Sequence, residues 1–201
     1  MKKVFVLLST VTLFSFIVND APITEDERKF ALDYFQETKE KLLSDVKGLS
    51  QAQLQWKPAD SVWSVAECIE HITITEKGIF EMVKGTLQQA ADPSKRSEVK
   101  NSDENVIKML TDRSYRVKTQ DGMKPTGQFG NAEETLEVFN QRRNEVIDYI
   151  KSTNDDLRNH YMDLPFGKLD SYQGLLFLAA HSQRHTLQIE EVMADPGFPK
   201  N

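Results

Sequence analysis

The sequence is poor in the residues that cross-link or bend a chain. Only one of its 201 residues is a cysteine, Cys68, so the chain has no internal disulfide and must be held by its core or by a bound metal. Glycine occurs nine times and proline seven times, too rarely for a collagen-like or low-complexity chain. Hydrophobic residues at 39% and charged residues at 28% indicate a globular domain rather than a disordered chain.

An excess of basic residues is also absent. The formal net charge is -6, and internal basic pairs such as Lys95-Arg96 and Arg142-Arg143 are short and have acidic neighbours. An acidic chain without a basic patch is repelled by phosphate backbones. We therefore expect no nucleic-acid partner.

Long apolar runs are lacking except at the N-terminus. Lys2 and Lys3 precede fifteen uncharged residues, Val4 to Val18, and the segment 19–22 ends the run. This pattern is typical of a secretory signal peptide, and the run is short for a membrane span. We predict a signal peptide over residues 1–20 and an exported protein, periplasmic or extracellular, with no membrane association after cleavage. An uncleaved anchor is the alternative, because no clean small-x-small pair precedes the break.

Helical periodicity fills most of the remaining chain, and no stretch alternates strictly enough to predict a strand. Four long helices are predicted from residues that act as N-caps. Three of them begin with capping boxes, and the fourth has a glutamine at the same spacing: Thr24 with Glu27, Ser64 with Glu67, Asn131 with Glu134, and Asp170 with Gln173. Apolar residues at helical spacing follow each start, for example Phe30, Tyr34 and Val46 in the first helix.

Shorter segments complete the predicted architecture. A short helix is expected from about Ser102 to Thr119, and the segment Gln51 to Ser61 is expected to be a loop over one end. The fold class is therefore all-α, an up-down four-helix bundle with a crossover connection and an extra short helix, forming one domain over residues 22–199.

Histidines are few, and two of the four share one helix face. His181 and His185 are four residues apart, so both rings leave the same side of the last helix. Leu178, Ile189 and Val192 mark that side as apolar, which directs the pair toward the core. Two adjacent buried imidazoles need several polar partners. Either a bound metal ion or hydrogen bonds to carboxylates and carbonyls would supply them.

The other two histidines are harder to place from spacing. His71 lies about 100° away from the apolar stripe of its predicted helix, so periodicity alone does not bring it to the pair on the last helix. His160 lies among Arg158, Asn159 and Asp163 and is interpreted as a solvated loop residue.

Two segments around these histidines resemble the DinB-like (DinB/YfiT-like) family of small metal-binding helical bundles. They are LQWKPADSVWSVAECIEHI, from Leu54 to Ile72, and HSQRHTLQIEEV, from His181 to Val192. The resemblance covers residues 22 to 199 and implies a four-helix bundle with three histidine ligands on a divalent metal. By position those ligands are His71, His181 and His185. The family is commonly cytoplasmic, so the export-like leader argues against a role that uses cytoplasmic low-molecular-weight thiols.

Three neutral imidazoles leave at least one coordination position open on zinc, nickel or iron. An open site of this kind suits a metal-dependent hydrolase or a thiol-type transferase acting on a small-molecule substrate. The alternative is a non-enzymatic bundle in which a metal or the histidine cluster is structural or supports a partner interface. Bundles of this size often pair, so a homodimer is considered.

Several neighbours of the histidines have two interpretations. Glu67 is a weak candidate for a catalytic acid or base, and its capping box with Ser64 is the preferred interpretation. Cys68 is a candidate fourth ligand or reactive thiol, although a lone buried cysteine is more often a core residue. The aromatic rings of Trp56 and Trp63 would either line a pocket or pack against the loop. The carboxylates of Glu70, Glu76 and Glu190 are interpreted as solvated surface groups.

Overall fold

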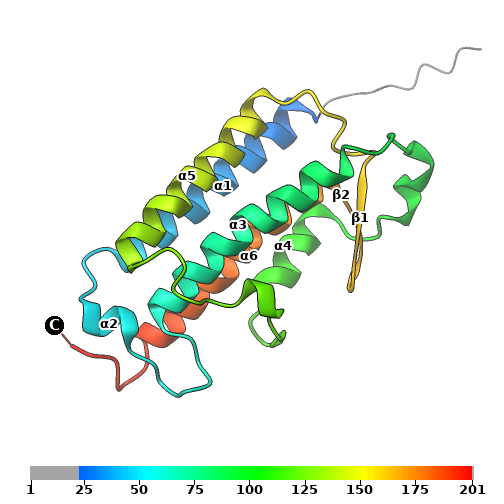
Figure 1. Cartoon of the computed structure of the whole chain (residues 1–201). Coiled ribbons are helices and arrows are strands. Elements are labelled where there is room, and N and C mark those ends of the chain that lie inside the picture. Colours follow the sequence, from blue (N-terminus) through cyan, green and yellow to red (C-terminus); the bar gives the residue numbers. More distant parts are fainter. Residues whose placement is uncertain (1–22, 201) are drawn as a thin grey trace, which may run out of the picture.

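The computed structural model describes residues 23–200, so the predicted signal peptide over residues 1–20 lies outside the described part of the chain. The helices are α1 (Glu25–Val46), α2 (Gln51–Gln55), α3 (Val65–Thr86), α4 (Asp103–Thr111), α5 (Ala132–Ser152) and α6 (Ser171–Met193). Two 3₁₀ helices, η1 (Pro93–Glu98) and η2 (Asp121–Met123), and two strands, β1 (Tyr161–Leu164) and β2 (Gly167–Asp170), complete the fold. The all-α four-helix bundle is confirmed (Figure 1).

The long helices begin where their N-caps predict. Thr24, Ser64 and Asn131 each accept a hydrogen bond from a backbone N–H one turn into the helix, and in all three capping boxes the glutamate bonds back to the cap. Asp170 accepts from the N–H of Gln173, but the Gln173 side chain donates instead to the carbonyl of Asn101 and to a carboxylate on α4. The helix starts are therefore local properties of the sequence.

Each long helix packs against two of the others: α1 against α5 and α6, and α3 against α5 and α6 (Figure 1). Arg28, in the first turn of α1, donates to the carbonyls of Ile150 and Thr153 at the end of α5. Thr86, the last residue of α3, shares a hydrogen bond with Ser171, the first residue of α6. Helices α3 and α5 therefore run toward the end of the bundle where α1 and α6 begin, and a crossover must return the chain between them.

The crossover spans residues 87–131 and places α4 beside α6. The predicted helix over Ser102–Thr119 is shorter than expected and ends at Thr111. Arg184 of α6 donates to the backbone carbonyls of Leu110, Asp112 and Tyr115. Because these carbonyls accept hydrogen bonds from Arg184, the α-helical hydrogen-bond pattern is not continued, and α4 ends at Thr111.

Two local predictions are corrected. Residues 161–170 form an antiparallel hairpin, with Met162 opposite Leu169 and Leu164 opposite Gly167. Its strands have only four residues each, too few for an alternation to be recognised, and Gly167 has a φ of +131° that the tight turn requires. The segment expected to be a loop over Gln51–Ser61 begins with the short helix α2, which is capped by Ser50.

Polar side chains cross the middle of the bundle between two apolar clusters. Toward the hairpin, the core contains residues such as Phe35, Val83 and Leu176, and toward α2 it contains residues such as Ile69 and Ile189. Between them lie buried polar residues from all four long helices: Thr38, Thr73, Glu76, Arg143, Ser182 and Thr186. Phe30 was expected in the core stripe of α1 but is 44% exposed. The histidines of interest adjoin this polar layer.

No helix within residues 23–200 combines the length and apolar character needed to cross a bilayer.

Candidate metal centre

The bundle brings His71, His181 and His185 together. One ring nitrogen from each lies within 4.8 Å of the other two, and the ring centroids are 4.4 to 5.1 Å apart. His71 is two turns into α3, while the other two rings leave successive turns of α6. These helices pack against each other along the bundle, so the contact between α3 and α6 builds the cluster. His71 and His185 are buried and His181 is half-buried.

In each of the three rings, the nitrogen that forms a hydrogen bond is Nδ1. His71 Nδ1 donates to the carbonyl of Met123 at 2.7 Å, and His185 Nδ1 donates to Gln188 Oε1 at 2.9 Å. His181 Nδ1 lies 3.3 Å from the hydroxyl of Thr75, whose own proton is directed to the carbonyl of His71 at 2.8 Å. Because these partners accept, all three Nδ1 atoms carry the proton. Each Nε2 then has a free lone pair, and no hydrogen bond within residues 23–200 engages it.

Burial keeps the three rings neutral. Desolvation, followed by repulsion from His71 and Arg184, lowers the pKa of His181 to about 3. Desolvation also lowers the pKa of His71, opposed by its bond to Met123, and lowers the pKa of His185 well below its usual value. Neutral imidazoles are the form that binds metal ions, so near pH 7 the cluster has no proton to displace.

The residues present therefore fit a metal ion. Three neutral imidazoles, with Nδ1 held by protein acceptors and Nε2 free, form the usual donor set of a three-histidine site. No cysteine, aspartate or glutamate of residues 23–200 joins the cluster. The three protein ligands would leave at least one coordination position for another molecule.

Aromatic rings and the crossover wall the cluster. The ring of Trp63 lies 4.8 Å from that of His71 and 5.9 Å from that of His185, between centroids. Phe177, one turn before His181, stacks on it at 6.2 Å. Trp56 does not reach the cluster and packs edge-on against Phe198. Of the two candidate tryptophans, only Trp63 contacts the histidine rings.

The other two candidate site residues are engaged elsewhere. Glu67 completes the capping box of Ser64, accepting its N–H at 2.7 Å, and also accepts from Lys57 at 3.0 Å. Cys68 is fully buried in the apolar cluster near α2, and burial raises the pKa of its thiol. Cys68 therefore has the environment of a core residue, with no thiolate to offer.

Three polar side chains that were expected to be solvated form hydrogen bonds to other residues of the protein instead. The carboxylate of Glu70 is 7% exposed and bonds to the crossover. Glu76 is 1% exposed and forms a two-bond pair with Arg143 of α5, at 2.6 and 2.8 Å. His160 is half-buried, and its Nδ1 donates to the carbonyl of Thr86 at 3.1 Å, because a carbonyl can only accept.

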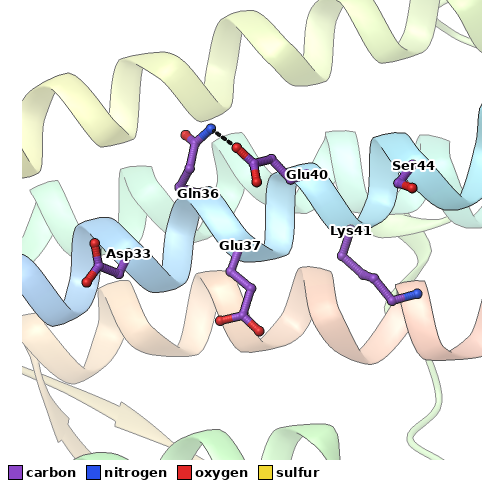
Figure 2. A pocket seen from close by; sticks show the side chains of 6 residues that line it. All are labelled: Asp33, Gln36, Glu37, Glu40, Lys41 and Ser44. Carbon is purple, nitrogen blue, oxygen red and sulfur yellow. Dashed lines mark hydrogen bonds between the residues drawn. The ribbon is translucent and has the colours of Figure 1, made fainter.

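A surface hollow of the described chain lies away from the histidines. Figure 2 shows its side chains, which extend from α1 and belong to exposed residues. The residues that line it are Asp33, Gln36, Glu37, Glu40, Lys41 and Ser44. None of them belongs to the cluster, so the chemistry of the histidines is not built on this hollow.

Comparison with known proteins supports the fold. Residues 34–189 match the sequence pattern of a family described as the DinB superfamily. The uncharacterized protein YuaE of Bacillus subtilis (strain 168) is 22% identical over 162 residues, which cover 80% of this chain and 96% of that protein. Among solved structures, YfiT from Bacillus subtilis superposes with a TM-score of 0.57 at 15% identity, covering 88% of this chain and 97% of that one. YfiT is described as a probable metal-dependent hydrolase with an unusual four-helix bundle topology.

Proposed function

We propose that this chain, which belongs to the DinB superfamily, binds one divalent metal ion through His71, His181 and His185 and acts as a metal-dependent hydrolase. The observation that carries the proposal is the shared pattern of the three rings. Each Nδ1 is held by a protein acceptor, and each Nε2 is left free beside the other two. A cluster of core histidines without a ligand would need hydrogen-bond partners at both nitrogens.

A metal ion held by His71, His181 and His185 would supply a Lewis acid with an open coordination position and would activate water as a nucleophile near neutral pH. The chain's own residues hold the ligands and shape the surroundings. Trp63 and Phe177 pack against the histidine rings and limit the access of bulk water, which favours a small-molecule substrate. Zinc, nickel and iron all accept this donor set.

Hydrolysis is favoured over thiol transfer by the position of the only cysteine. Cys68 is buried and its pKa is raised, so the chain contributes no thiolate of its own. The description of YfiT as a probable metal-dependent hydrolase supports the same choice. Thiol transfer would require a second, thiol-bearing substrate.

A hydrolase assay with controlled metal content tests the proposal. Metal-free protein would be reloaded with zinc, nickel or ferrous iron and screened against ester, amide and phosphoester substrates, with and without a low-molecular-weight thiol. We expect hydrolysis that requires metal, needs no thiol and is lost in His185→Ala. Activity only with the thiol would instead establish a transferase. X-ray absorption showing a coordination shell filled by protein atoms would establish a structural site.

We also propose that the protein is exported, on the strength of the predicted leader over residues 1–20. Mass spectrometry of the N-terminus of the protein recovered outside the cytoplasm tests this separately. A mature N-terminus close to residue 21 is expected, and an intact leader on cytoplasmic protein would contradict the proposal.

A further inference from the structure

We infer that Glu70 is a positioning residue for the histidine cluster: it fastens the crossover to α3 so that the Met123 carbonyl keeps Nε2 of His71 free for a metal ion. The inference rests on the proposed metal site. It concerns a residue outside the cluster of ligands, and it explains why a carboxylate is buried next to His71 in sequence.

The carboxylate of Glu70 receives three backbone hydrogen bonds from one short stretch of the crossover. The N–H groups of Thr126 and Gln128 donate to Oε1, each at 3.0 Å, and the N–H of Gly127 donates to Oε2 at 2.9 Å. Glu70 forms no ion pair within residues 23–200. A buried carboxylate without a basic partner is costly unless N–H groups satisfy it, so these bonds account for its position.

The backbone of this stretch is shaped to meet a carboxylate. Gly127 has a φ of +77°, which directs three successive N–H groups toward one point, as in the anion-binding turns called nests. The side chain of Glu70 occupies that point. The crossover is therefore held to α3 by a carboxylate in a preformed backbone cradle.

The same stretch controls His71. Met123 precedes the cradle by three residues, with Lys124 and Pro125 between them, and its carbonyl accepts the proton of His71 Nδ1 at 2.7 Å. A carbonyl has no proton to donate, so this contact selects the tautomer with a lone pair on Nε2. Pro125 restricts the backbone between the two contacts, which links the position of the carbonyl to that of the cradle.

Loss of the hydrogen bonds between Glu70 and the crossover should release the Met123 carbonyl, so that His71 can take either tautomer. Removing a group that orients a metal-binding histidine typically weakens metal affinity about 10-fold to 100-fold. We expect a loss of this size in Glu70→Gln, because the amide can accept from the cradle with only one of its two terminal atoms. Gly127→Ala should act in the same direction, because alanine is strained at this φ.

Two measurements on the purified protein test the inference. The first is NMR of the ring nitrogens of ¹⁵N-labelled histidine in the metal-free protein, with His71 assigned by its absence in His71→Gln. The second is zinc affinity by competition with a chelating indicator. The matched control is Val83→Ala. It shortens a fully buried side chain about 18 Å from His71 along α3 and destabilises the same helix.

In the wild-type protein we expect His71 to be protonated at Nδ1. In Glu70→Gln we expect a mixture of tautomers and zinc affinity about 10-fold to 100-fold weaker, whereas Val83→Ala should keep both properties. An unchanged tautomer and affinity in Glu70→Gln would overturn the inference, as would equal losses in Val83→Ala. If the wild-type protein binds no zinc, nickel or iron, the proposed function fails, and the NMR result still decides whether Glu70 sets the tautomer.

Discussion

Replacing His181 with glutamine should flatten the pH dependence of stability of the metal-free protein between pH 7 and pH 5. The pKa of His181 in the folded protein is about 3, against an ordinary value of 6.5. As the pH falls below 6.5 the unfolded chain therefore binds this proton first. The stabilisation is complete above pH 6.5 and is lost progressively as the pH falls toward 3.

The size of the effect follows from this shift. Each pH unit below the unfolded pKa costs about 1.4 kcal/mol, so lowering the pH from 7 to 5 costs about 2 kcal/mol through His181 alone. His71 and His185 also have lowered pKa values, so their contributions have the same sign. Between pH 7 and pH 5 the free energy of unfolding of the wild-type protein should therefore fall by more than about 2 kcal/mol. That of His181→Gln should fall by about 2 kcal/mol less than the wild type.

Urea denaturation in the presence of a chelator measures this directly. The free energy of unfolding of both proteins would be measured at pH 7 and pH 5, and the two pH differences compared, so that any effect of the substitution at pH 7 cancels. A difference between them of about 2 kcal/mol is expected. Equal pH dependence in both proteins would refute the assignment of a desolvated, neutral His181.

Three further predictions concern the surroundings of the cluster. Arg143→Ala leaves Glu76 buried without its partner and should lower the free energy of unfolding in urea by about 3–5 kcal/mol, whereas replacing both residues with Met and Leu should restore most of it. Addition of Ni²⁺ should quench tryptophan fluorescence in Trp56→Phe but not in Trp63→Phe, since only Trp63 contacts the histidines; the opposite pattern would move the metal elsewhere. Cys68 should react with a thiol reagent only at the rate of global unfolding, and rapid labelling of the folded protein would contradict its burial.

The starts of the helices could be predicted because their causes are local. Thr24, Ser64 and Asn131 each cap a helix with a glutamate three residues away, and all of these contacts form within one turn. The end of α4 could not be predicted in the same way. Its boundary depends on Arg184, more than 70 residues later, which donates to the carbonyls of Leu110 and Asp112 on either side of Thr111.

The cluster itself was only partly visible in the sequence. His181 and His185 share one helix face, so their proximity follows from helical geometry. His71 is buried although it lies off the apolar stripe, because α3 contacts α5, α6 and the crossover and therefore has more than one buried face. Its place beside the other two was expected only from the family resemblance. Glu70 was misinterpreted as surface for the same reason, since its partners are backbone groups of a distant loop.

The metal content of the purified protein tests the central claim most directly. Elemental analysis after purification under metal-replete conditions should find one divalent ion per wild-type chain and almost none in His185→Ala. His160→Ala is the matched control, because His160 bonds to Thr86 at the far end of α3 and should leave the metal content unchanged. A wild-type chain without stoichiometric metal, or one that keeps its metal in His185→Ala, would contradict a metal site built from His71, His181 and His185.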